Sequence, residues 1–146
     1  LVAIGLERGD MLRYRTARNQ TADLGAMLAF WQSQTAPSIL KRWKTSSAEW
    51  NASVFVASRL DAEYDIARAK RDLVDGARRD LVLALLATND DRSAVADVAD
   101  WTVPVFPLKG RDLIAAGMAP GKAMGETLAS LRNAWLASDY LLSATE

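Results

Sequence analysis

The residues with the clearest chemical potential lie near the end of the sequence, in FPLKGRDLIAAGMAPGKAMGETL, residues 106–128. This stretch holds four of the eight glycines of the chain, Gly110, Gly117, Gly121 and Gly125. A glycine lets the backbone approach a neighbour closely because it has no side chain. Backbone N–H groups at the start of a helix can bind phosphate, and Lys122 would add positive charge there. The stretch therefore predicts either a phosphate contact or a tight crossing of two helices.

The same stretch predicts a hairpin of two helices. Asp112 in the first turn of a helix over roughly 110–116 would favour the positive end of the helix dipole. Gly117 suits the left-handed residue that ends this helix, and Pro120 suits the first position of a second helix over roughly 120–138. In the structural interpretation the glycines are caps and a close helix crossing, with the last two on one face. In the functional interpretation they admit a phosphate.

The composition excludes several kinds of chemistry. The 146 residues include neither cysteine nor histidine, which excludes disulfides, thiolate metal sites and histidine-based catalysis. Carboxylates alternate at Asp61, Glu63 and Asp65, and we interpret them as a solvated helix face. Asp90 and Asp91 follow a predicted helix and are interpreted as a turn. We therefore expect no catalytic and no metal-binding residues in this chain.

Charge is balanced overall but unevenly distributed. Lys and Arg total 18, as do Asp and Glu, which counts against strong autonomous binding of nucleic acid. Residues 1–44 nevertheless carry seven basic and three acidic residues, a balance of +4, whereas residues 61–100 carry six and ten, a balance of −4. One end of the chain could therefore face a polyanion.

Two basic clusters lie within these first 44 residues. The first lies in the first predicted helix and consists of Arg8, Arg13, Arg15 and Arg18. The second lies beside Trp43 and consists of Lys41, Arg42 and Lys44. Basic residues beside aromatic ones can contact RNA through phosphate and base stacking. The alternative, which we favour, is a solvated helix face with Trp43 buried. The second cluster is therefore a secondary candidate for RNA contact.

Apolar residues recur at three- and four-residue spacing almost throughout, which predicts an all-α fold. The segment RRDLVLALLA, residues 78–87, is nearly all apolar after Asp80 and predicts the central core helix. We expect one compact domain of seven or eight helices over residues 1–146, ending in the glycine-rich hairpin. The expected caps and breakers are Thr21 or Asp23, Pro37, Gly76, and Pro104 with Pro107 in an extended connector.

The sequence shows no apolar run of membrane-spanning length and no signal-peptide pattern. We therefore expect a cytoplasmic location and no membrane partner. Leu1 is not a start methionine, and we expect the chain to be a domain of a longer protein.

Residues 101–140, WTVPVFPLKGRDLIAAGMAPGKAMGETLASLRNAWLASDY, resemble the C-terminal region of bacterial tRNA nucleotidyltransferases, the CCA-adding enzymes, and of the related poly(A) polymerases. Those proteins carry a proline-containing connector, a Gly-x-Asp-Leu, a glycine, a Pro-Gly, another glycine, and a helix with leucines and a tryptophan. The matching residues are Pro107, Gly110, Asp112, Leu113, Gly117, Pro120, Gly121, Gly125, Leu128, Leu131 and Trp135. Upstream of residue 101 the match is only in kind: helical, with an apolar helix at 81–87.

The resemblance implies a division of labour within a longer polypeptide. In this family a catalytic head carries a Gly-Ser nucleotide loop and a strand-borne carboxylate pair, so Mg²⁺ and nucleoside triphosphates would bind there. Neither motif occurs in this chain. The helical body and tail of the family hold tRNA by its acceptor stem and elbow. This chain would correspond to the tail, contacting RNA and its own head without performing nucleotidyl transfer alone.

The residues expected at the RNA backbone all lie in the hairpin. Basic side chains would neutralise phosphates and glycines would permit backbone donation, at Lys109, Gly110, Arg111, Gly117, Gly121, Lys122 and Gly125. Many relatives have proline where Lys122 stands, and the lysine adds a cation. Two alternatives stay open: a purely structural, docking or dimerisation domain without RNA contact, which the zero net charge favours, and an independent adaptor carrying the same hairpin. The choice between CCA and poly(A) addition belongs to the absent head.

Overall fold

A computed structural model of the chain describes residues 8–60, 63–89 and 91–141, with side chains from residue 12 onward. The described residues form nine α-helices and no β-strand, so the predicted all-α fold is confirmed. The count exceeds the seven or eight expected, and Gly76 lies between two of these helices with a φ of 90°, as expected of a breaker. The segment 52–57, whose composition also suits a strand, lies within a helix.

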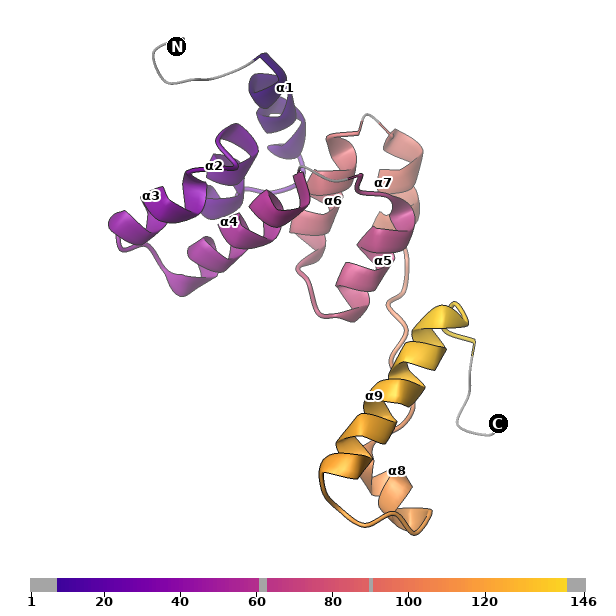
Figure 1. Cartoon of the computed structure of the whole chain (residues 1–146). Coiled ribbons are helices and arrows are strands. Elements are labelled where there is room, and N and C mark those ends of the chain that lie inside the picture. The colour runs from indigo at the N-terminus through magenta and orange to yellow at the C-terminus, as the bar shows by residue number, and fades with distance from the viewer. Residues whose placement is uncertain (1–7, 61–62, 90, 142–146) are drawn as a thin grey trace. The chain divides into compact units, whose positions relative to one another are not determined.

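The chain folds as two compact units, Leu1–Thr102 and Val103–Glu146, which we call unit 1 and unit 2. The helices are seen in Figure 1. Those of unit 1 are α1 (Arg8–Ala17), α2 (Leu24–Trp31), α3 (Ala36–Arg42), α4 (Ser47–Leu60), α5 (Ile66–Val74), α6 (Arg79–Ala87) and α7 (Arg92–Ala99). Those of unit 2 are α8 (Gly110–Ala115) and α9 (Lys122–Ala137). Residues 103–109, around the two prolines, form no helix, as predicted for the connector.

The core of unit 1 forms around α2, α4 and α6, whose facing side chains are withdrawn from water. Helix α6 buries Leu81, Val82, Leu85 and Leu86, which confirms its prediction as the central core helix. Full burial of each such side chain contributes about 1.5–3 kcal/mol. Phe30 of α2 and Val56 of α4 are also fully buried.

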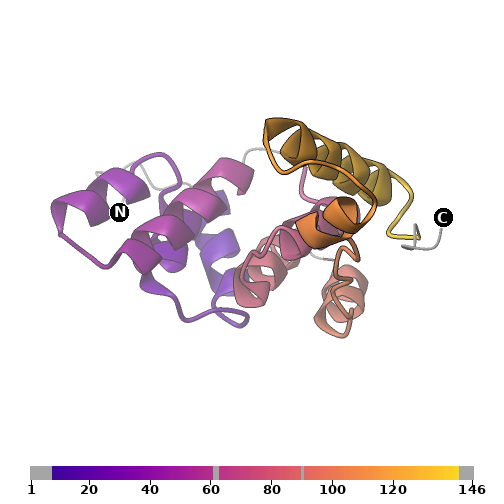
Figure 2. The same cartoon turned by 90° about the horizontal axis from the view of Figure 1, so that it is seen from below.

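Helices α2 and α4 pack along each other, as Figures 1 and 2 show, and Gly25 marks the closest point. A Cβ atom added at Gly25 would lie 1.9 Å from the carbonyl oxygen of Glu49. No side chain fits in that space, so glycine is required for the two backbones to meet. The close helix approach predicted for the C-terminal glycines is therefore found at a different glycine.

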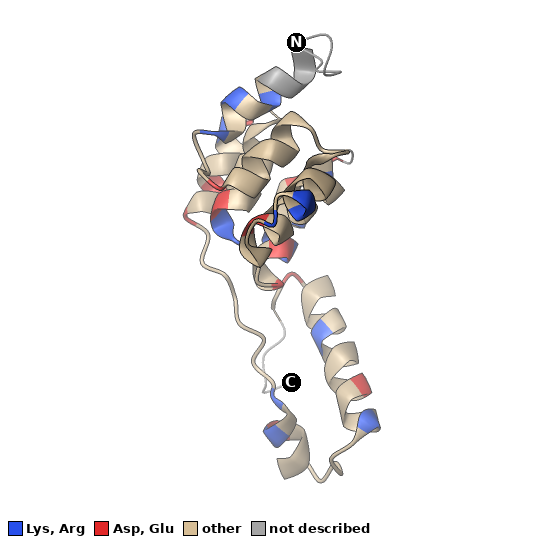
Figure 3. Ribbon diagram, turned by 90° about the vertical axis from the view of Figure 1, so that its left-hand side faces the viewer, with Lys and Arg blue, Asp and Glu red and all other residues tan. Residues whose placement is uncertain are grey.

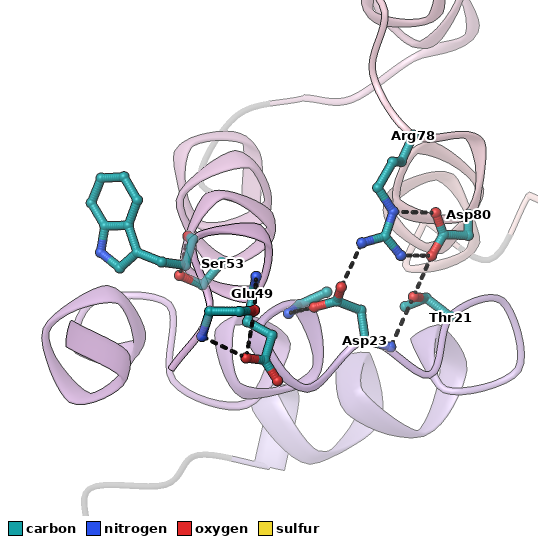
Figure 4. Close-up of polar contacts among 9 residues, drawn as sticks. Thr21, Asp23, Glu49, Ser53, Arg78 and Asp80 are labelled. Carbon is teal, nitrogen blue, oxygen red and sulfur yellow. Dashed lines mark hydrogen bonds and ion pairs between the residues drawn. The ribbon is translucent and has the colours of Figure 1, made fainter. Parts of the chain in front are cut away.

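A polar bridge fastens the start of α2 to the start of α6 (Figure 4). Arg78 donates to Asp23 at 2.5 Å and to Asp80 at 2.6 Å. Thr21 donates its hydroxyl to Asp80 at 2.7 Å, and Asp23 also accepts the N–H of Ala26 at 3.1 Å. Asp23, one of the two predicted caps, thus caps α2 while it joins two helices that are far apart in sequence.

A second bridge connects α4, α5 and the segment between them. Arg59 holds the Asp72 carboxylate with two bonds, of 2.6 and 2.8 Å, and Tyr64 donates to the same carboxylate at 2.8 Å. Burial alone would raise the pKa of Asp72, but the bonds from Arg59 and Tyr64 outweigh it and lower that pKa below its usual value. Burial and the bond to Asp72 raise the pKa of Tyr64.

Two of the acidic residues singled out in the sequence, Asp65 and Asp91, serve as helix caps. Asp65 accepts the N–H of Arg68 at 2.8 Å and caps α5. Glu63 and Asp65 are exposed, as expected of a solvated face, but both precede the helix rather than lie on it. Asp91 accepts the N–H of Ala94 at 3.0 Å and begins α7. Asp61 and Asp90 lie outside the described residues. In the described ranges, no helix is both long enough and apolar enough to cross a membrane.

Candidate nucleic-acid interface

The first helix of the hairpin is short and held at both ends. At its start, the N–H of Lys109 donates to the carboxylate of Asp112 at 2.7 Å, so Asp112 serves the helix start as predicted. At its end, Gly117 has a φ of 91°. The N–H groups of Gly117 and Met118 bond the carbonyls of Ile114 and Leu113, both at 2.9 Å. This pair of backbone hydrogen bonds, together with a left-handed glycine, is the Schellman motif.

The second helix begins at Lys122, two residues later than the predicted position of Pro120. Gly121 is its N-cap residue, with φ 154° and ψ −168°, a conformation that favours glycine. No side chain caps this end of α9. The N–H groups of the first turn of a helix have no partner within the helix itself, so this start offers donors and the positive end of the helix dipole.

The hairpin closes around one aromatic cluster in unit 2. Trp135 of α9 is 2% exposed, and the ring centroids of Phe106 and Tyr140 lie 5.4 and 5.1 Å from its own. Gly110 packs against α9, where an added Cβ would lie 3.5 Å from Met124 Cε, an ordinary contact distance. The aromatic cluster therefore fixes α9 against the connector, while Gly110 marks where the two helices of the hairpin touch.

The other three glycines face open space. At Gly117, Gly121 and Gly125 an added Cβ atom would meet nothing within 4 Å. The structural interpretation is therefore right about caps at the first two and wrong about a tight crossing at Gly121 and Gly125. Gly125 in particular neither caps a helix nor packs against one. A glycine inside a helix costs about 0.5–1 kcal/mol relative to alanine, and no contact within the described residues offsets that cost.

The predicted hairpin cations are exposed, and Figure 3 shows basic residues at the start of both helices. The side chains of Arg111 and Lys122 are 79% and 91% exposed. Their ion pairs with Asp112 and Glu126 are both 3.6 Å long. Exposed pairs of this kind contribute at most about 1 kcal/mol, so they can yield to another anion. Lys109 is exposed as well.

The two basic clusters of unit 1 differ from the favoured interpretation in one respect. Lys41, Arg42 and Lys44 are exposed, but so is Trp43, which is 63% accessible. The expectation that Trp43 is buried was wrong: it is the C-cap residue that follows α3, and its side chain is exposed. In the first cluster Arg15 and Arg18 are exposed and Arg13 is partly buried, while the side chain of Arg8 lies outside the described residues.

The described residues contain no group of three or more acidic side chains placed to hold a metal ion.

Comparison with known proteins points to tRNA nucleotidyltransferases. The chain is 30% identical to CCA tRNA nucleotidyltransferase 1, mitochondrial, of Danio rerio over 116 residues, which cover 73% of this chain and 27% of that protein. It is 26% identical to the Mus musculus protein of the same name over 115 residues, covering 72% and 26%. For the Homo sapiens protein the values are 31% over 65 residues, covering 44% and 15%.

The match spans about a quarter of the length of the first two relatives. No protein-family model matches the chain. The similarities therefore support the CCA-adding family and indicate a protein related to tRNA nucleotidyltransferases.

Proposed function

We propose that this chain is the RNA-contacting C-terminal region of a tRNA nucleotidyltransferase or poly(A) polymerase relative of bacterial type. The α8–α9 hairpin contacts the tRNA backbone and helps to position the RNA for nucleotide addition at its 3′ end. A head on the same polypeptide performs that reaction with Mg²⁺ and nucleoside triphosphates. A cytoplasmic location is part of the proposal, although the names of the relatives place those proteins in mitochondria.

One observation carries the proposal: the start of α9 has no side-chain cap, is open to solvent and carries positive charge. No side chain at the N-cap Gly121 accepts a hydrogen bond from the first N–H groups of α9. An added Cβ atom at Gly121 or Gly125 would meet nothing within 4 Å. Lys122 extends from the first turn into solvent. A phosphate needs this combination of backbone donors, a helix N-terminus and room for approach. The names of the CCA-adding relatives state an action on tRNA, and tRNA is therefore the phosphate-bearing ligand that we propose.

A docking role without RNA contact is the second candidate, and apolar exposure in unit 2 favours it. Ile114 of α8 is 49% exposed and Val105 of the connector is 82% exposed. Both could lie against a head on the same polypeptide or against a second copy. The two candidates differ in the expected effect of salt, because only phosphate contact releases counterions.

Binding of a fluorescein-labelled tRNA to the chain, followed by fluorescence anisotropy, tests the proposal. The decisive variant is the Lys109→Ala/Arg111→Ala/Lys122→Ala triple. If each cation neutralises one phosphate, the triple should bind on the order of 100-fold more weakly at about 0.1 M salt.

A matched triple, Arg18→Ala/Arg71→Ala/Arg92→Ala, removes the same charge from exposed positions in unit 1. It should bind nearly as tightly as the parent chain. If both triples weaken tRNA binding equally, the hairpin contributes only net charge and makes no specific contact with the RNA. No binding by the parent chain at low salt would favour the docking role.

A further inference from the structure

The last turn of α3 and the start of the segment that leads to α4, residues 41–45, present three cations around an exposed indole; we call this segment the loop. Lys41, Arg42 and Lys44 are all exposed, and Trp43 between them is 63% accessible. None of these three cations has an ion-pair partner among the described residues. A large aromatic surface and three uncompensated charges in four consecutive residues are unfavourable for the isolated chain, and they suit a ligand that is both anionic and aromatic.

The one carboxylate nearby in sequence is already occupied. Glu49 accepts from the N–H and the hydroxyl of Ser46, at 2.9 and 2.8 Å, and Ser46 accepts the N–H of Glu49 at 3.2 Å. This reciprocal pair is a capping box at the start of α4, and Figure 4 shows it at Glu49. Glu49 therefore stabilises the helix start and leaves the positive charge of the loop uncompensated.

The loop is also held rigidly on its other side. The N–H groups of Lys44 and Thr45 bond the carbonyls of Lys41 and Leu40, both at 3.3 Å, which is a Schellman motif. A helix cap at each end therefore fixes the backbone of this loop before any ligand arrives. Such preorganisation lowers the entropy lost on binding.

Lys44 occupies the position in that motif where glycine is preferred. Its φ is 54°, in the left-handed region. A residue with a side chain costs about 1 kcal/mol or more in that conformation. The fold alone would therefore be served better by glycine, and the lysine adds a charge next to Trp43 that the fold does not use.

A shallow groove runs beside the loop. It has a volume of about 340 Å³ and is lined by Leu40, Lys41, Thr45, Ser47 and Trp50. Trp50 is 39% exposed. The lining combines one cation, two hydroxyls and an indole, which is the mixture that a ribose-phosphate chain with its bases contacts.

We propose that this loop binds an unpaired stretch of RNA, with a base stacked on Trp43 and the adjoining phosphates against Lys41, Arg42 and Lys44. The proposal takes its class of ligand from the proposed function, and it adds a second contact that reads single-stranded rather than duplex RNA. Stacking on an exposed indole needs a base that is free of its helix, whereas the open N-terminus of α9 needs only phosphate.

The test compares two labelled RNAs by anisotropy: a blunt-ended duplex, and the same duplex with a short single-stranded 3′ tail. Trp43→Ala should weaken binding of the tailed RNA by about 5- to 150-fold, the range for loss of one stacked base. It should leave binding of the blunt duplex unchanged. Trp43→Phe keeps a ring and should restore most of the affinity for the tailed RNA.

Lys44→Gly separates binding from folding. This variant should melt at the same temperature as the parent chain or higher, because it removes the left-handed strain, yet it should bind the tailed RNA more weakly. Arg71→Ala removes an exposed cation of α5 and is the matched control, which should bind both RNAs like the parent chain. Unchanged tailed-RNA binding in Trp43→Ala, or an equal loss on both RNAs, would overturn the proposal.

The hairpin triple distinguishes failure of this proposal from failure of the proposed function. Lys109→Ala/Arg111→Ala/Lys122→Ala should weaken binding of both RNAs. If it changes neither while Trp43→Ala still acts on the tailed RNA, the loop contact stands and the hairpin contact fails. If the triple acts and Trp43→Ala does not, the hairpin contact stands and the loop contact is wrong. Binding of neither RNA by the parent chain would overturn both.

Discussion

Glycines that look alike in the sequence do different things at the scale of single residues. Gly25 allows α4 to touch the backbone of α2, and Gly117 supplies a left-handed helix end. Gly125 does neither and opens onto solvent from the first turns of α9. The abundance of glycine in the hairpin predicted a close approach there, whereas the tight contact between two helices occurs at Gly25, outside the hairpin.

The same substitution should therefore have opposite effects at two glycines. Gly25→Ala places a methyl group 1.9 Å from the Glu49 carbonyl oxygen, and we expect it to destabilise the protein by about 1–3 kcal/mol, as overpacking does. Gly125→Ala meets nothing and should stabilise by about 0.5–1 kcal/mol through helix propensity. Urea unfolding followed by circular dichroism measures both. Equal effects of the two substitutions would contradict the assigned roles.

Asp72 should make stability depend on acid pH. Its pKa is lowered in the folded protein, where the bonds from Arg59 and Tyr64 outweigh the opposing effect of burial. The stabilisation is therefore complete above the unfolded pKa of about 3.9 and is lost as the pH falls below that value towards the folded pKa. The free energy of unfolding, measured from pH 7 downward, should drop through this window.

Asp72→Ala is the control for that titration. Leaving Arg59 and Tyr64 without their acceptor should cost roughly 3–5 kcal/mol at neutral pH. The variant should also lose part of the acid-dependent drop, because the titrating group is gone. A variant whose unfolding free energy follows the same pH curve as the parent chain would show that other carboxylates govern the acid limb.

At the scale of elements, the sequence predicted the ends of several helices correctly. Asp23, Gly76, Asp112 and Gly117 end or begin helices as their types suggested. Pro120 was predicted to be the first residue of the last helix, but Gly121, with φ 154°, is the N-cap and α9 begins at Lys122. Local hydrogen-bonding chemistry is contained in a few neighbouring residues, so it can be predicted without knowledge of the tertiary fold.

The capping box before α4 illustrates a signal that the sequence contained and that we did not use. Ser46 and Glu49 stand three apart before an apolar stretch, which is the pattern of the motif. Glu49→Ala should destabilise the protein by about 0.5–2 kcal/mol, the range for loss of a cap. Glu49→Gln should retain most of the stability because an amide oxygen can accept the same N–H. Thermal melts of the two variants make the comparison, and equal losses would argue against the motif.

Contacts between distant segments could not be predicted in the same way. The bridge from Arg78 to Asp23 joins residues 55 positions apart, and the Gly25 crossing joins two helices. Exposure of Trp43 was mispredicted for the same reason, since apolar type suggests burial and only the fold shows which face a helix end presents. Charge and glycine content identified the candidate hairpin in the sequence. Only the structure shows that three of its glycines face open space.

At the scale of the whole molecule, the two units differ in how much apolar surface they bury. Unit 1 contains nearly all buried side chains of the described residues, while unit 2 has Trp135 as its one buried residue among them. A segment of this size with so small a core is marginal on its own. We therefore expect the folding of unit 2 to depend more strongly on a binding partner than the folding of unit 1 does.

Expression of the units as separate chains should reveal this difference. Residues 1–102 should give a helical circular dichroism spectrum and a cooperative thermal transition. Residues 103–146 should be largely unfolded alone and gain helicity when RNA is added, if the hairpin is a binding element. A cooperative transition in the isolated 103–146 chain would contradict the expected dependence on a partner.

The measurement that tests the central claim most directly is the salt dependence of tRNA binding. The account predicts that the logarithm of the binding constant falls linearly with the logarithm of salt concentration. It also predicts a slope about three units shallower in Lys109→Ala/Arg111→Ala/Lys122→Ala, because each cation releases about one counterion. Parallel lines for the parent chain and this variant would show that the hairpin does not contact the RNA backbone.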